Sequence, residues 1–70
     1  MKRVAIDSSA LRSVGYRDDL ALLEIEFVSG EVYRYHAVPH SVHRALMNAD
    51  SRGRYFVEHI RDVYPTTRIT

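Results

Sequence analysis

The sequence predicts an α+β domain, in which a three-stranded antiparallel β-meander is followed by two short α-helices packed on one of its faces. Alternating apolar and polar residues between Leu20 and Val28 indicate a half-buried strand. In the second half, apolar residues recur at helical spacing around Leu46 and again around Phe56. Because 70 residues suffice for one hydrophobic core and not for two, we expect a single domain over residues 1–70.

The first strand is expected over Leu11 to Tyr16, where β-forming residues lead into a turn at Asp18 and Asp19. Residues 1–6, in which apolar and polar side chains alternate, are a candidate extension of this strand. In the second strand the apolar residues share one face and the acidic residues share the other: Leu23, Ile25 and Phe27 against Glu24 and Glu26.

Ser29 and Gly30 open a hairpin into a third strand over residues 31–38, and two loop lengths compete for its register. A two-residue loop would place Ile25 opposite Arg34. A three-residue loop, with Gly30 in the left-handed conformation, has a different set of pairs: Ile25 with Tyr33, Leu23 with Tyr35 and Glu24 with Arg34. We predict the three-residue loop, because it gathers the apolar side chains on one face and opposite charges on the other.

A helix is predicted from about Pro39 to Ala49, since proline is compatible with the first helical turn. The breaker-rich stretch of residues 48–53 separates it from a second helix that runs to about Arg61. Tyr64 and Pro65 follow that helix, and residues 66–70 form a polar tail that either frays or adds an edge strand.

The predicted core consists of the apolar and aromatic residues that the meander and the helices share: Leu23, Ile25, Phe27, Tyr33, Tyr35, Leu46, Phe56 and Ile60. Two roles remain open for Tyr33 and Tyr35, whose side chains project from one face because they lie two residues apart on a strand. Under the helices they belong to the core. On an open face the same spacing would form a platform on which unpaired bases stack.

Composition excludes several classes of protein. No apolar run approaches the roughly 18 residues of a transmembrane helix, and the basic start at Lys2 and Arg3 is followed by polar residues before a signal-peptide core can develop. The chain has no cysteine, which rules out disulfides, thiolate zinc sites and thiol catalysis. We therefore expect a cytoplasmic protein without a membrane-spanning segment.

Charge is distributed unevenly, although the formal net charge is only +1. Residues 34–70 hold six basic and three acidic groups, and all but one of the ten basic residues in the chain are arginine. Guanidinium groups suit phosphate or carboxylate ligands. The candidate nucleic-acid or phosphate-binding residues are the arginines of the helical half and its entry: Arg34, Arg44, Arg52, Arg54 and Arg61. Ser51 and Gly53 lie near the predicted start of the second helix, whose free amide groups favour an anion.

Neither a metal site nor a catalytic site is expected. Four histidines are present, His36, His40, His43 and His59, but they lack the cysteine and carboxylate partners of typical sites. Ser8 and Ser9 are expected to satisfy backbone groups rather than to act as nucleophiles. Glu24 and Glu26 have Arg34 as a nearby partner, so they do not resemble a pair of glycosidase carboxylates. We therefore predict no cofactor and no enzymatic activity.

An ordered series of short motifs resembles the KTSC domain, a family named for its occurrence at the C-terminus of some lysyl-tRNA synthetases and also found as free-standing bacterial proteins. The series covers most of the chain: Ser8-Ser9-Ala10-Leu11, Gly15-Tyr16, Phe27 to Gly30, Tyr33-Arg34-Tyr35, Val38-Pro39, Arg54-Tyr55-Phe56, Ile60-Arg61 and Tyr64-Pro65. The resemblance implies a small α+β domain without assigned chemistry, for which the synthetase context suggests RNA binding.

Two functional hypotheses follow. The first is a binding module for RNA or another phosphorylated ligand, which it contacts through the arginines of the helical half. The second is a protein-interaction module or small inhibitor of a host or phage partner, with a homodimer as one form, because the edges of the predicted sheet are unpaired.

Overall fold

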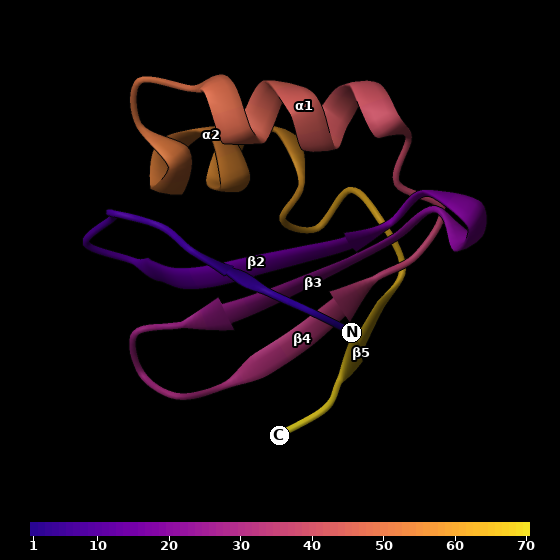
Figure 1. Cartoon of the computed structure of the whole chain (residues 1–70), viewed down its shortest axis with the longest axis horizontal. Helices are drawn as coiled ribbons and strands as arrows, with labels where there is room; N and C mark the ends of the chain where they lie inside the picture. The colour runs from indigo at the N-terminus through magenta and orange to yellow at the C-terminus, as the bar shows by residue number, and fades with distance from the viewer.

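A five-stranded antiparallel sheet carries two helices on one of its faces (Figure 1). The computed structural model describes residues 1–70. The elements, in chain order, are β1 (Val4–Ala5), β2 (Leu11–Arg17), a 3-10 turn η1 (Asp18–Leu20), β3 (Leu22–Phe27), β4 (Val32–Tyr35), α1 (His40–Asn48), α2 (Arg52–His59) and β5 (Thr66–Arg68). The α+β class and the placement of both helices on one face are as predicted.

The sheet is wider than the predicted meander, because a short strand joins each of its edges. The strand order is β1-β2-β3-β4-β5, so every strand pairs with its neighbour in sequence. Val4 of β1 lies opposite Val14, and Thr67 of β5 lies opposite Arg34. The candidate strand extension at residues 1–6 is therefore an edge strand of its own, and the polar tail supplies the other edge.

The β3–β4 hairpin has the register predicted for a three-residue loop. Leu23 pairs with Tyr35, Glu24 with Arg34 and Ile25 with Tyr33. The amide of Phe27 donates to the carbonyl of Glu31 over 2.9 Å, which closes the loop, and Gly30 has φ +99°. This left-handed conformation is one that glycine adopts without the steric cost of a Cβ atom.

A β-bulge in β2 brings apolar residues of irregular spacing to the same face of the sheet. Leu11 pairs with Phe27 and Ser13 with Glu26, so Arg12 is an extra residue in the ladder. Without the bulge, Leu11 and Ser13 would share a face because side chains alternate along a strand. With it, Leu11 joins Val14 in the core, and Ser13 reaches the opposite face.

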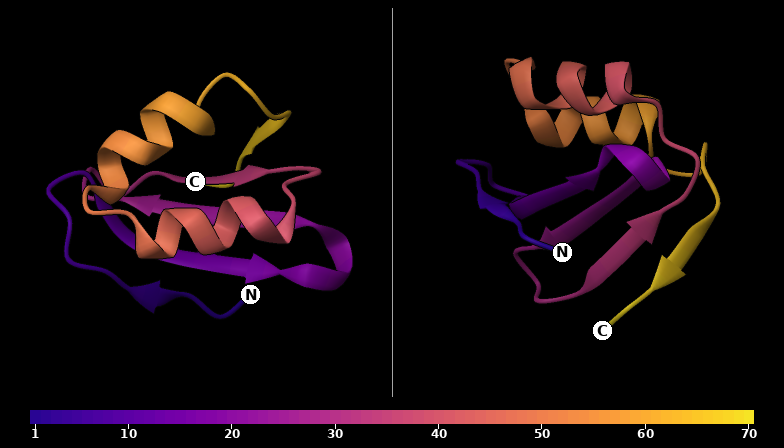
Figure 2. Two further views of the ribbon diagram at one scale, coloured as in Figure 1. Left: turned by 90° about the horizontal axis from the view of Figure 1, so that it is seen from above. Right: turned by 45° about the vertical axis from the view of Figure 1, so that its right-hand side comes forward.

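Both helices begin and end close to the predicted positions. Pro39 precedes α1 with φ −64°, and the Ser51 hydroxyl caps α2 by accepting a hydrogen bond from the Arg54 amide at 3.2 Å. After α2, Asp62 has φ 61°, which turns the chain back toward the sheet, where β5 pairs with β4. Two further views show the helices side by side above the strands (Figure 2). Neither helix has the length and apolarity needed to cross a bilayer.

The core lies between the helices and the sheet. Six of the eight expected residues are buried, namely Leu23, Ile25, Tyr35, Leu46, Phe56 and Ile60, and Leu11, Val14 and Val38 join them. Phe27 and Tyr33 differ from the expectation, since both are only partly buried and pack against the edge of this cluster. They lie toward the loop end of the β3–β4 hairpin, where both side chains border a groove.

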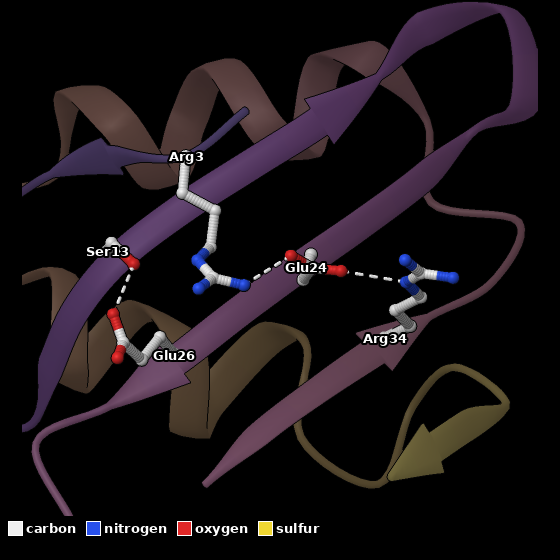
Figure 3. Close-up of polar contacts among 5 residues, drawn as sticks. All are labelled: Arg3, Ser13, Glu24, Glu26 and Arg34. Carbon is white, nitrogen blue, oxygen red and sulfur yellow. Dashed lines mark hydrogen bonds and ion pairs between the residues drawn. The ribbon is translucent and has the colours of Figure 1, made fainter. Parts of the chain in front are cut away.

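The face of the sheet away from the helices is polar and centres on Glu24 (Figure 3). Although Glu24 is only 3% exposed, its carboxylate accepts hydrogen bonds from Arg34 at 2.7 Å and from Arg3. Burial opposes the charged carboxylate, but the hydrogen bonds and charges of the two arginines outweigh it, so the pKa of Glu24 is lowered. Beside it, the Ser13 hydroxyl donates to Glu26 at 2.8 Å.

Gly15 makes the contact between Arg3 and Glu24 possible. Gly15 pairs directly with Glu24 on β3, and a Cβ atom at position 15 would lie 2.8 Å from the Lys2 carbonyl and 3.0 Å from the Arg3 side chain. The missing side chain is therefore the space through which Arg3 reaches the carboxylate.

Replacing Gly30 by alanine tests the hairpin geometry. We expect Gly30→Ala to lower the free energy of unfolding by about 1 kcal/mol, because alanine is strained at this positive φ although nothing lies within 4 Å of the added methyl group. Gly30→Asn should cost less, since asparagine tolerates the left-handed region better. Urea denaturation measures the stability of both variants. Equal stability of the wild type and the two variants would contradict the left-handed conformation of Gly30.

The Glu24 network predicts a pH-dependent loss of stability. A carboxyl with a lowered pKa in the folded state stabilises the protein above the ordinary glutamate pKa, and this contribution disappears as the pH falls through the lowered value. We expect Glu24→Gln to cost about 1–2 kcal/mol at neutral pH. The gap between the two proteins should narrow on acidification in urea titrations at several pH values. Glu58→Gln is the exposed control, and a gap that does not depend on pH would refute the argument.

Candidate functional site

A groove of about 610 Å³ opens on the helix-covered face of the sheet, between the β3–β4 hairpin and α2. We call it the aromatic groove, and its principal lining residues are Phe27, Tyr33, Tyr35, Phe56, Arg61 and Asp62. Its walls come from the residues before β2, the β3–β4 hairpin, α2 with the turn that follows, and the start of β5. Segments distant in sequence therefore converge on this groove.

Four aromatic residues line the groove, and their rings contact one another. Phe56 packs edge-on against Phe27 and against Tyr35, with ring centroids 5.4 Å apart in both pairs. Tyr33 packs edge-on against Phe27 at 5.8 Å. These T-shaped contacts fix the ring orientations. Because Tyr33 and Phe27 are only partly buried, part of their surface is available to a ligand.

Tyr35 combines a buried ring with an unpaired hydroxyl. The residue is 4% exposed and lines the groove, and its hydroxyl makes no hydrogen bond within the chain. Burial, reinforced by the neighbouring Tyr33, raises the pKa of Tyr35 to about 12. Tyr35 is thus a neutral hydrogen-bonding group, able to donate and to accept, at the floor of the aromatic groove.

Arg61 lines the groove, and Arg68 lies beside it, opposite Tyr33; each has an acidic partner. Arg61 lies 3.9 Å from the Asp62 carboxylate, and Arg68 of β5 lies 3.5 Å from Glu31. Arg61, Asp62 and Arg68 are largely exposed and Glu31 is partly so, and ion pairs of this kind contribute little stability. Both guanidinium groups can therefore turn toward an incoming anion at small cost.

The arginines predicted as binding residues do not form one cluster. Arg34 is bound to Glu24 on the opposite face of the sheet, and Arg44 is exposed on α1. Arg52 donates to the Met47 carbonyl at 2.9 Å, at the C-terminal end of α1, and its Nε atom is buried without a partner. Arg54 pairs with Glu58, one turn further along α2. Of the five, Arg61 is the one that borders the aromatic groove.

A second groove lies at the start of α2, which the sequence indicates as a candidate phosphate-binding position. It contains Arg52 and Arg54, but three carboxylates share the space: Asp7, Asp50 and Glu58. Ser51 already accepts a hydrogen bond from the Arg54 amide there. The lining of this groove is thus of mixed charge, as is that of the aromatic groove, which Arg61 lines together with Glu31 and Asp62.

The histidines pair with aromatic or hydroxyl side chains. His43 stacks on Tyr16 with ring centroids 4.5 Å apart, and burial together with the nearby His40 lowers the pKa of His43. His59 packs against Tyr55 at 4.4 Å, and His36 is 2.9 Å from the Thr67 hydroxyl. No three histidine, aspartate or glutamate side chains converge in a way that could hold a metal ion.

Ser8 has a structural contact of the kind expected from the sequence. Its hydroxyl accepts hydrogen bonds from the amides of Ala10 and Leu11, both at 3.2 Å, where the chain enters β2. No histidine is among its hydrogen-bond partners, so this hydroxyl caps the backbone at the entrance of the strand.

Sequence reasoning did not single out Arg68 or the role of Phe27 at the groove. A signal for Arg68 was present: Thr66, Thr67 and Ile69 are β-branched, which favours a strand, and a strand beside β4 would place Arg68 next to Tyr33. No comparable signal marks Phe27, because its exposure depends on how far the helices extend over the sheet.

A five-stranded antiparallel meander, covered on one face by two short helices and opening there into one aromatic groove, defines a small α+β domain. The chain belongs to the KTSC domain family, whose model matches residues 7–64. The crystal structure of a KTSC domain protein from Yersinia pestis is similar over 99% of this chain and 97% of that one, with a TM-score of 0.93 and 36% sequence identity.

Relatives include both small and large proteins. An uncharacterized protein of Stutzerimonas stutzeri is 59% identical over 56 residues, which is 80% of this chain and 79% of that protein. A lysine–tRNA ligase of Nostoc punctiforme is 40% identical over 55 residues, or 79% of this chain. This match spans only 10% of the length of that ligase.

The contrast between two tyrosine hydroxyls tests the geometry of the groove. Tyr16 donates a 2.7 Å hydrogen bond to the Val38 carbonyl, so we expect Tyr16→Phe to lower the free energy of unfolding by about 1 kcal/mol. Tyr35→Phe should leave it unchanged or raise it slightly, because no partner is lost. Thermal unfolding compares the two variants. A large destabilisation by Tyr35→Phe would contradict an unpaired hydroxyl.

Proposed function

We propose that the chain is a non-enzymatic, cytoplasmic module that binds RNA through the aromatic groove, with Arg61 and Arg68 contacting phosphate groups. The observation that carries this proposal is the meeting, at one groove, of partly accessible aromatic rings with the guanidinium group of Arg61, beside which Arg68 lies opposite Tyr33. Proteins that bind single strands combine these two features, since rings stack on bases and cations follow the backbone.

The ion pairs of the arginines favour the aromatic groove as the binding surface over the other arginines that the sequence predicted. Arg34 satisfies a nearly buried carboxylate, and Arg52 caps a helix end, so recruiting either of these two to a ligand would leave polar groups unpaired. Arg61 and Arg68 have only the weak ion pairs with Asp62 and Glu31 to lose. The proposal therefore narrows the expected arginine surface to one predicted residue, Arg61, and adds Arg68.

The relatives add support from context. Lysine–tRNA ligases of Nostoc punctiforme, Trichormus variabilis and a Nostoc species contain a segment 36–40% identical to 55 residues of this chain. A ligase of that name acts on tRNA, so a domain within it is placed near RNA. We extend that setting to this chain as part of the proposal.

A protein-interaction module is the second candidate, and strand β5 favours it. Its three residues are exposed, and no strand pairs with its outer edge. An edge of this kind can accept a strand from another protein or from a second copy of the chain. Such binding would depend on backbone hydrogen bonds and would respond weakly to salt, whereas RNA binding responds strongly.

Titration of labelled tRNA at several salt concentrations tests the proposed function. We expect the logarithm of the association constant to fall linearly with the logarithm of salt concentration. Arg61→Gln and Arg68→Gln should each make that slope shallower by about 0.7–0.9, the contribution of one phosphate contact. Fluorescence anisotropy measures the affinities.

Arg17→Gln is the matched control, because Arg17 also forms an exposed ion pair, with Asp19, at the η1 end of the sheet. This variant should keep the wild-type slope. Equal effects of Arg17→Gln and Arg61→Gln would show general charge attraction instead of a site. Absence of salt-dependent binding to RNA would leave the protein-interaction module as the better hypothesis.

A further inference from the structure

The hydroxyl group of Tyr35 lacks a partner although its ring is almost fully buried. It forms no hydrogen bond within the chain, and it is not sealed from the groove, since the one fully enclosed unpaired side-chain atom is Nε of Arg52. Because this hydroxyl is neither enclosed nor bonded to another group of the chain, it is free to hydrogen-bond to a ligand in the groove that Tyr35 lines. That ligand must present a hydrogen-bonding group at the depth of Tyr35.

The walls above this hydroxyl specify the shape of the ligand. Tyr33 is only partly buried, and its ring packs edge-on against Phe27, which leaves part of the ring surface accessible. A ligand that reaches Tyr35 passes along this ring. A flat group with an apolar face and a polar edge satisfies both tyrosines at once, as a nucleobase does.

The charges at the rim specify what adjoins the flat group. Arg61 borders the groove next to Tyr35, and Arg68 lies opposite Tyr33 on the neighbouring strand. Both arginines have exposed partners at 3.5 Å or more, so an anion can replace those partners. A phosphodiester on either side of an inserted base fits this arrangement.

We infer that the aromatic groove binds one unpaired nucleotide of an RNA strand, with the base against the Tyr33 ring and its edge hydrogen-bonded to the Tyr35 hydroxyl. This inference rests on the proposed function and makes it more specific. Bases in a duplex are stacked on both faces and cannot enter a recess between a hairpin and a helix. The groove therefore selects single-stranded loops or ends over helical stems.

The experiment compares a short, labelled, mixed-sequence ribo-oligonucleotide with the same strand annealed to its complement, at one salt concentration near physiological. We expect the single strand to bind and the blunt duplex to bind at least tenfold more weakly. Tyr35→Phe should weaken single-strand binding about two- to tenfold, the effect of one hydrogen bond. Tyr33→Leu should weaken it about tenfold or more through loss of stacking.

Tyr55→Phe is the control, because Tyr55 packs against His59 on α2 and does not line the groove. It should bind as the wild type does. Circular dichroism melts establish that each variant is folded, and Tyr35→Phe, which loses no internal hydrogen bond, keeps the test decisive even where Tyr33→Leu fails to fold.

The outcomes separate the inference from the proposed function. Equal binding of duplex and single strand, or single-strand binding that neither Tyr33→Leu nor Tyr35→Phe weakens, overturns the inference and leaves RNA binding in place at another surface. Binding of neither RNA overturns both. Single-strand preference that depends on Tyr33 and Tyr35 and not on Tyr55 supports both.

Discussion

The register of the β3–β4 hairpin is the constraint on which the rest of the structure depends. Because side chains alternate along a strand, a slip of one residue would move Tyr33 and Tyr35 to the opposite face. It would also leave Glu24 without Arg34. The same three-residue loop therefore assigns the aromatic rings to the helix-covered face and the ion network to the other. The groove and the core exist only in this register.

The two faces of the sheet are stabilised by different interactions. Apolar packing under α1 and α2 holds one face, where Phe56 of α2 reaches Phe27 at the end of β3. On the other face, Glu24 binds one arginine from β4 and another that precedes β1, which ties the first residues of the chain to the middle of the sheet. The edge strand β1 has only two residues, so this contact adds to its few backbone pairs.

Local sequence patterns were sufficient for the hairpin register and both helices, because alternation, glycine and helical spacing act over a few residues. They were insufficient for the bulge at Arg12, which allows Leu11 and Val14 to share a face despite a spacing of three. They also could not show that Arg34 and Arg52 would be engaged inside the fold, since their partners are contributed by other elements. The groove could not be predicted either, because it depends on the turn of the chain at Asp62. This residue has a left-handed conformation, which aspartate tolerates but which its presence in the sequence does not require.

The walls of the aromatic groove come from four separate stretches of the chain, which lie within residues 9–10, 27–35 and 56–62 and at residue 66. No fragment retains this recess, so a ligand held there has affinity for the native state alone. Ligand binding therefore raises the free energy of unfolding of the whole domain. The increase is about 2.7 kcal/mol when the ligand is present at 100 times its dissociation constant. In a chain this short, that increment is a large share of the total stability, so saturation with ligand would rescue variants that are otherwise mostly unfolded.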